Sequence, residues 1–76
     1  MYELRITVGD HKFEVPRVAD EDTVYSHIQG YLAAFGISVL LSDELRDDAA
    51  FMAELRKTGE FTGNVLHAEI TVTRTT

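Results

Sequence analysis

The chain contains no cysteine and no tryptophan, and Pro16 is its single proline. Without cysteine, neither a disulfide nor a thiolate metal site can stabilise the fold. No apolar run approaches the roughly 18 residues that a membrane-spanning helix needs. The first residues also lack the basic start and apolar core of a secretory signal. We therefore expect a cytoplasmic protein with no membrane contact.

Basic residues are scarce as well. Seven Lys and Arg stand against 13 Asp and Glu, and the formal net charge is −6. The deficit lies in the middle of the chain, where residues 18–54 hold eight acidic residues and one basic residue, Arg46. Nucleic-acid binding draws most of its affinity from Lys and Arg that neutralise phosphates. We therefore expect no direct nucleic-acid ligand and favour a protein partner with a basic surface.

The length sets the scale of the fold. A chain of 76 residues with 45% apolar residues is long enough for one small core, so we expect a single domain over residues 1–76. One core of this size supports a stability of about 3–5 kcal/mol. A homodimer would be one way of adding to it.

The beginning of the chain alternates between apolar and polar residues, as a strand with one wet face does. We expect a hairpin in which Val8 pairs with Phe13. Ile6 then faces Val15, and Asp10-His11 forms the tip. A shift by one residue would turn half of the apolar side chains outward, so the pattern favours this pairing.

The end of the chain alternates in the same way. Leu66 to Thr73 is predicted to form a strand, and Gly63-Asn64 just before it is typical of a turn.

A helix is predicted to begin near Asp20 or Asp22, either of which can cap the free N–H groups of its first turn. Apolar residues then recur at three- and four-residue spacing as far as Phe35. Gly36 suits the left-handed residue that ends a helix. Gly30 lies inside the helix, where a close crossing by another element would explain it.

The segment Ile37–Leu41 fits either a short buried strand or the lead-in to a second helix. The second helix has Ser42 as its N-cap and Leu41 in its apolar stripe. On a continuous helix Asp48 would project from the apolar side, where an unpaired carboxylate costs several kcal/mol. We therefore expect the helix to break at Asp47-Asp48, with one of these residues capping a new helix.

Together these elements predict an α+β fold of order ββααβ. Two helices pack on one face of an antiparallel sheet of three strands, or of four if Ile37–Leu41 is a strand. The second face of the sheet would be polar. The sheet also has two edges, one of which can pair with another chain.

No spacing of residues indicates catalysis or metal binding. Ser26-His27 is the one Ser/His neighbour pair, and adjacent helix residues point about 100° apart. His11 and His67 match no metal-site spacing, and the acids lack the alternation and glycine of a calcium loop. We therefore expect a non-enzymatic protein with no cofactor and no metal.

The acidic residues allow two interpretations. Acids in the first turn of a helix complement its dipole, and this accounts for Asp20, Glu21, Asp22, Asp43 and Glu44, while the excess could serve solubility. The remaining acids are like-charged neighbours of one another, and we expect Asp43, Asp47 and Glu54 to share the outward side of the second helix. They favour an acidic surface that binds a protein, with Phe51 and Tyr25 as aromatic anchors. The predicted partner-binding residues are Asp20, Glu21, Asp22, Asp43, Glu44, Asp47, Asp48, Phe51 and Glu54.

Carboxylates along a helix can imitate a phosphate backbone and occupy a basic groove that normally holds nucleic acid. In size, charge and lack of catalytic residues the chain is similar to phage-encoded inhibitors of host defence, including anti-CRISPR proteins and other DNA mimics. No sequence motif carries this likeness. The alternative is a small assembly protein that dimerises or docks through a sheet edge or the polar sheet face.

Overall fold

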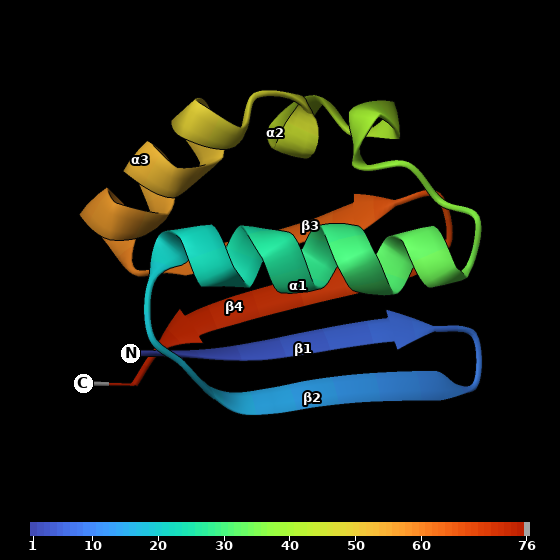
Figure 1. Cartoon of the computed structure of the whole chain (residues 1–76), viewed down its shortest axis with the longest axis horizontal. Helices are drawn as coiled ribbons and strands as arrows, with labels where there is room; N and C mark the ends of the chain where they lie inside the picture. Colours follow the sequence, from blue (N-terminus) through green and yellow to red (C-terminus); the bar gives the residue numbers. More distant parts are fainter. Residues whose placement is uncertain (76) are drawn as a thin grey trace.

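Eight short elements follow one another along residues 1–75, the part of the chain that the computed structural model describes (Figure 1). They are strands β1 (Tyr2–Val8) and β2 (His11–Val18), helix α1 (Glu21–Ala34), the 3-10 turn η1 (Val39–Leu41), helices α2 (Asp43–Arg46) and α3 (Asp48–Thr58), and strands β3 (Glu60–Val65) and β4 (Ala68–Arg74). The predicted α+β class is confirmed.

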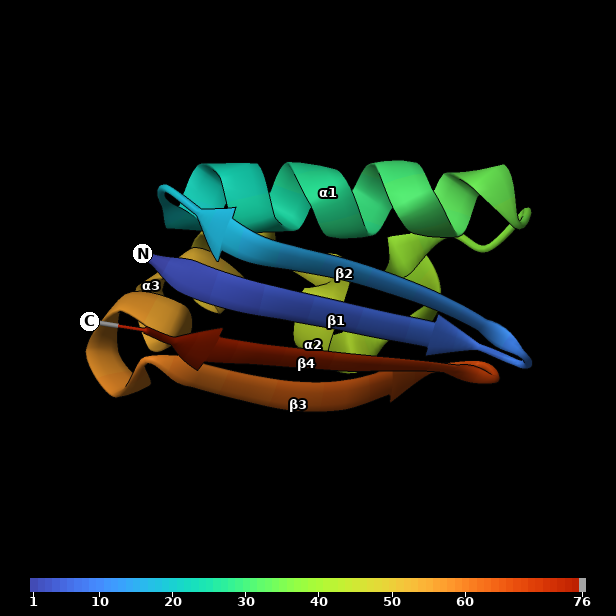
Figure 2. The ribbon, with the colours of Figure 1, turned by 90° about the horizontal axis from the view of Figure 1, so that it is seen from below.

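The strands form one antiparallel sheet in the order β2-β1-β4-β3. The helices lie on one face of it, with α1 above β1 and β2 and with α2 and α3 toward β3 (Figure 1). Figure 2 shows the opposite face uncovered. The fourth strand is Glu60–Val65, because Ile37–Leu41 forms a bend and the turn η1 instead of a strand.

The first hairpin has the predicted faces but a different register. Ile6 lies opposite Phe13, and Val8 lies opposite His11, so the predicted pairing of Val8 with Phe13 was wrong by two residues. The cause is the tightness of the turn, which consists of Gly9-Asp10 alone. Gly9 has φ +60°, and a glycine at the first position of a two-residue turn closes a hairpin without strain. A shift of two residues keeps every side chain on its face.

The second hairpin turns at Leu66-His67, so the predicted turn at Gly63-Asn64 was wrong. Both of those residues lie inside β3. Packing favours glycine there: a Cβ on Gly63 would lie 2.8 Å from Cζ of the Phe61 ring, which leans across it and would have to shift. The turn itself holds an ordinary side chain in a left-handed conformation, since Leu66 has φ +55° and is 65% exposed.

Helix α1 begins and ends as predicted. The Asp20 carboxylate accepts a hydrogen bond from the Thr23 N–H at 2.9 Å and caps the first turn. At the other end Gly36 has φ +72°. Its N–H donates to the Ala33 carbonyl, and the next N–H along the chain donates to the Leu32 carbonyl, both at 3.0 Å. This pair of bonds is the Schellman arrangement.

The predicted break in the second helical region is also confirmed. Helix α2 ends at Arg46, and Asp47 is the N-cap of α3, where its carboxylate accepts from the Ala50 N–H at 3.2 Å. The buried Tyr25 hydroxyl donates to the Leu45 carbonyl at 3.0 Å. Tyr25 thereby satisfies a carbonyl at the end of α2 that the break leaves without a helical partner.

The core fills the space between the sheet and the helices. Its fully buried side chains come from both layers and include Leu4, Ile6, Ile28, Leu32, Leu45 and Ile70. Leu41, expected in the apolar stripe, is 60% exposed because η1 turns it outward. The expected crossing at Gly30 was wrong, since within residues 1–75 no atom beyond its chain neighbours and its own helical backbone lies within 4 Å of a Cβ built there.

Gly30→Ala should therefore raise the free energy of unfolding by up to about 1 kcal/mol, because alanine loses less backbone entropy in a helix and meets nothing at this position. Urea unfolding followed by circular dichroism measures the change. Ala33→Gly, at another exposed position of the same helix, should lower stability by a similar amount. A lower unfolding midpoint for Gly30→Ala would contradict this account of the helix.

Leu66→Gly should also stabilise the protein, by up to about 1 kcal/mol. A left-handed conformation costs a residue with a Cβ about 1–2 kcal/mol, and the greater freedom of glycine in the unfolded chain offsets part of the gain. Leu66→Ala is the control, since it removes the same exposed side chain and keeps the strain. If thermal unfolding shows equal gains for both variants, the cause is the exposed apolar surface and not the backbone.

Candidate functional site

The first acidic cluster, at the start of α1, is largely taken up by the fold. The Thr23 backbone N–H and then its hydroxyl hydrogen-bond to Asp20 and hold the pKa of that carboxyl below its ordinary value. Asp22 is exposed. Asp20 thus serves as a helix cap, and Asp22 is the member of this cluster with a freely exposed carboxylate.

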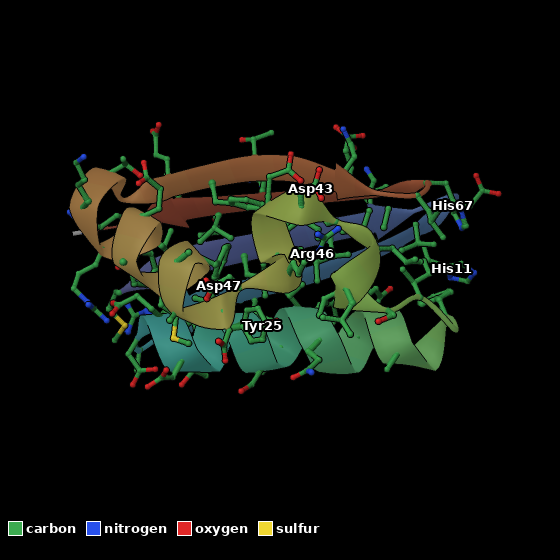
Figure 3. All side chains as sticks on the ribbon, turned by 90° about the horizontal axis from the view of Figure 1, so that it is seen from above. His11, Tyr25, Asp43, Arg46, Asp47 and His67 are labelled. Carbon is green, nitrogen blue, oxygen red and sulfur yellow. The ribbon has the colours of Figure 1, made fainter. Side chains whose placement is uncertain are left out.

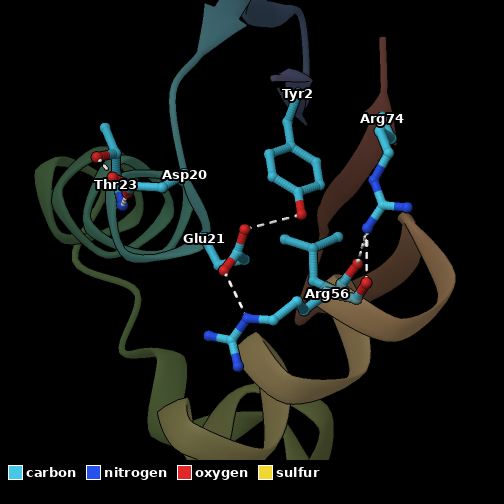
Figure 4. A network of polar contacts seen from close by, with 7 residues as sticks. Tyr2, Asp20, Glu21, Thr23, Arg56 and Arg74 are labelled. Carbon is cyan, nitrogen blue, oxygen red and sulfur yellow. Dashed lines mark hydrogen bonds and ion pairs between the residues drawn. The ribbon is translucent and has the colours of Figure 1, made fainter. Parts of the chain in front are cut away.

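Glu21 joins three elements (Figure 4). The Tyr2 hydroxyl donates to Oε2 at 2.9 Å, and Nε of Arg56 donates to Oε1 at 3.0 Å. These bonds, that from Tyr2 first, hold the pKa of Glu21 below its ordinary value. Arg74 extends the network, because its guanidinium donates to the Arg56 carbonyl at 2.6 Å. Glu21 therefore ties α1 to β1 and α3, and its predicted role in partner binding competes with this structural one.

The second cluster is divided by the break between α2 and α3. In Figure 3, Asp43 lies on the side of α2 toward β3, whereas Asp47 lies on the side toward α1 and Tyr25. The expectation that Asp43, Asp47 and Glu54 share one outward face was therefore wrong. The pKa of the Tyr25 hydroxyl is raised by burial and then by the nearby charges of Asp48 and Asp47.

Part of this cluster meets β3 in a groove of about 520 Å³. Helices α2 and α3 form one wall, and the start of β3 forms the other. The groove brings together three of the predicted acids and adds a fourth from β3. Its lining residues are Asp43, Glu44, Ala50, Phe51, Glu54, Glu60, Phe61 and Thr62.

Two aromatic rings form the apolar part of the groove. Phe51 and Phe61 meet edge to face, with ring centroids 4.9 Å apart. Phe51 is only 3% exposed, and its far side packs on Tyr25 in the core. Neither Phe51 nor Tyr25 is an accessible anchor, because their helices turn both rings into the core. The half-buried Phe61 is the aromatic side chain that a partner can touch.

The carboxylates of the groove are mostly without counter-charges. Asp43 forms an ion pair with Arg46 at 2.8 Å, on the exposed surface. Within residues 1–75, no Lys, Arg or His lies within ion-pairing distance of Glu44, Glu54 or Glu60. Glu44 and Glu54 therefore carry unneutralised negative charge on the helical wall of the groove, and Glu60 adds its charge at the start of β3.

Glu44 is held in place by the residue expected to cap α2. The Ser42 hydroxyl makes no capping bond and instead donates to Glu44 Oε2 at 2.6 Å. This bond is the main cause of a pKa below the ordinary value for Glu44. Ser42 is itself buried, so it positions the carboxylate on the wall of the groove.

Sequence reasoning missed the side of the groove that β3 contributes. Glu60, Phe61 and Thr62 were placed after the second helix and outside any strand. The alternation of Phe61, Gly63 and Val65 with polar residues was the available signal, and the glycine in the middle obscured it.

The other residues considered for chemistry lie apart. His27 is half-buried near the Phe13 ring, and His11 and His67 lie at the end of the molecule with the hairpin turns (Figure 3). In the described part of the chain, no three His, Asp or Glu side chains are grouped as metal ligands would be. No helix over residues 1–75 has the length and apolar character needed to cross a membrane.

The pKa of Glu21 sets a pH dependence of stability. Because its carboxyl is more acidic in the folded than in the unfolded protein, the unfolded state binds more protons as the pH falls. Its contribution is complete above the ordinary carboxyl range and is lost as the pH falls through the folded pKa. Glu21→Gln should therefore lower the free energy of unfolding at neutral pH, and the free energy of this variant should fall less as the pH is lowered.

Urea midpoints measured from about pH 7 to about pH 3 test this. Glu14→Gln, at an exposed position of β2, should leave the slope unchanged; equal slopes in all three proteins would contradict the role given to Glu21.

Comparison with models of protein families found no match, and comparisons with curated proteins and with solved structures found none either.

Proposed function

We propose that this protein is a non-enzymatic module that binds a basic surface of a partner protein in the groove between α2, α3 and β3. The observation that carries the proposal is the lining of that groove. Four acidic residues line it together with the Phe61 ring, and no basic residue does.

This combination suits lysine and arginine. Both side chains have an apolar stem that packs against a ring and a cationic end that seeks carboxylates. Phe61 offers the ring, and Glu44 and Glu54 on the helical wall offer carboxylates that no basic side chain of residues 1–75 neutralises. Arginine adds a favourable interaction of its planar cation with the aromatic face.

The sharper form of the proposal is inhibition. A basic surface that binds nucleic acid would be blocked by the groove, as in phage-encoded anti-CRISPR proteins and DNA mimics. The net charge of −6 supports it, since the long-range field attracts such a surface and repels nucleic acid. The break at Asp47 divides the acids between two sides, so they form no regular row along one helix. We therefore propose blocking at the groove, and not imitation of a whole phosphate backbone.

A second candidate is assembly through the sheet, which the uncovered face favours (Figure 2). Arg5 and Thr71 lie opposite each other at its centre. Assembly through this face predicts that Thr71→Lys abolishes association and that salt has little effect. The groove proposal predicts the reverse.

A displacement assay tests the groove. A fluorescent DNA oligonucleotide is first bound to an arginine-rich peptide, and release of the DNA is followed as the protein is added. The double variant Glu44→Lys with Glu54→Lys should need about tenfold more protein, because the pairs are close and charge reversal makes them repulsive. Moderate salt should weaken the native protein strongly.

The matched control carries the same change of charge outside the groove. Asp22→Lys with Asp48→Lys leaves the groove intact and should alter the assay much less. If both double variants lose activity equally, total acidity alone acts and the groove is not the binding site. Circular dichroism establishes that all variants fold.

A further inference from the structure

Strand β3 is an open edge of the sheet, paired with β4 on one side only. The two-residue turn at Leu66-His67 places Val65 opposite Ala68, the position of a hydrogen-bonded pair in such a hairpin. Bonded and non-bonded pairs alternate along an antiparallel ladder. The N–H and C=O groups of Thr62 and Asn64 therefore point away from β4.

The remaining bonds agree with this alternation. The Arg74 N–H donates to the Gly59 carbonyl at 2.7 Å, which continues the bonded series beyond the strand. The outward backbone groups of Glu60 are already bonded to the Thr58 hydroxyl. This hydroxyl accepts a hydrogen bond from the Glu60 N–H at 3.2 Å and donates one to the Glu60 carbonyl at 3.0 Å. Within residues 1–75, no hydrogen bond occupies the outward backbone groups of Thr62 or Asn64.

The opposite edge is protected and β3 is not. Strand β2 contains Pro16, which has no N–H to offer, and its ladder with β1 is irregular near the same residue. It also carries Lys12 and Arg17 along the edge. Strand β3 has neither a proline nor a basic residue, and Gly63 leaves its middle without a side chain. Natural sheets rarely leave an edge so accessible.

The open edge runs along the acidic groove. Phe61 lies opposite Val72 and faces the helices, so the helix-side face of β3 opens into the groove. In a strand added to this edge, a residue opposite Phe61 would point into the groove, and one opposite Gly63 would lie on the same, helix-side face. Residues opposite Thr62 and Asn64 would point to the uncovered face of the sheet.

We propose that the partner supplies an extended basic segment that adds to β3 as a fifth, antiparallel strand and places every second side chain, lysine or arginine, in the groove. This inference rests on the proposed function and specifies how the basic partner binds. Backbone hydrogen bonds to Thr62 and Asn64 give affinity, and the groove selects the charge, as in other cases of strand addition.

Charge selects this occupant over a second copy of the chain. Two copies paired through β3 about a twofold axis would bring the unpaired carboxylates of both grooves together. Like charges brought close in this way repel one another. A basic strand meets the same carboxylates with opposite charge.

Peptides that alternate lysine and valine test the proposal, with binding followed by NMR titration. With lysine in the groove, the valine N–H groups face β3 and the lysine N–H groups face away. N-methylation of the valines should weaken binding at least about tenfold, because it removes the donors to the edge. N-methylation of the lysines should have little effect. The amide signals of Thr62 and Asn64 should shift and become protected from exchange on binding of the unmodified peptide.

The protein offers a second matched pair. Thr62→Pro removes one outward N–H without touching the ladder to β4 and should weaken binding about tenfold, whereas Thr62→Val keeps the N–H and should bind normally. If Thr62→Pro does not fold, the N-methylated peptides still decide.

Three results would overturn the inference. If both methylated peptides bind equally well, the backbone hydrogen bonds to β3 do not contribute and charge alone holds the peptide. The proposed function would then remain intact. A peptide-free dimer with protected Thr62 and Asn64 amides would make a second copy the occupant. Absence of binding by any of the peptides would exclude strand addition, while the displacement assay would still decide the role of the groove independently.

Discussion

The cost of burying one carboxylate shapes the helical layer of this protein. A continuous helix through residues 43–58 would direct Asp48 toward the apolar side, between Leu45 and Met52. The penalty for an unpaired buried charge exceeds the loss of a few helical hydrogen bonds. The chain therefore breaks at Asp47, which caps the new helix, and Asp48 remains exposed in the first turn of α3. Leu45 and Phe51, on the two sides of the break, are then both buried.

The break also creates the groove. Because α2 and α3 are short and separately oriented, the acids of the two helices no longer follow one helical face. Asp43 and Glu44 turn toward β3, where Glu54 and Glu60 also lie, and Asp47 turns toward α1. Tyr25 holds this geometry from below through its bond to the Leu45 carbonyl. The helix break, which keeps a carboxylate out of the core, thereby also determines where the acidic side chains lie on the surface.

Local signals predicted much of the fold. The caps at Asp20 and Gly36, the break at Asp47-Asp48 and the faces of β1 and β2 each follow from a few neighbouring residues. The errors concern positions where turn geometry or side-chain packing, and not the pattern of residue types, decides the structure. Gly63 was read as a turn because its reason, the Phe61 ring lying across it, is a matter of side-chain packing. Strand β3 was consequently missed, and with it the part of the groove that Glu60 and Phe61 form. The acids themselves were identifiable, but their division between two sides of the break was not.

The departures from locally favourable structure gather around β3. Its edge lacks the proline and basic residues of β2, its middle is a glycine, and the turn that follows holds Leu66 in a strained conformation. Unpaired carboxylates stand beside it although they repel one another. The strand glycine, the strained turn and the repulsion between carboxylates each cost stability in a small domain, and natural sequences tend to break local rules where function requires it. A basic strand on this edge would satisfy the free backbone groups and neutralise the carboxylates together, so a single ligand would account for both the open edge and the clustered acids.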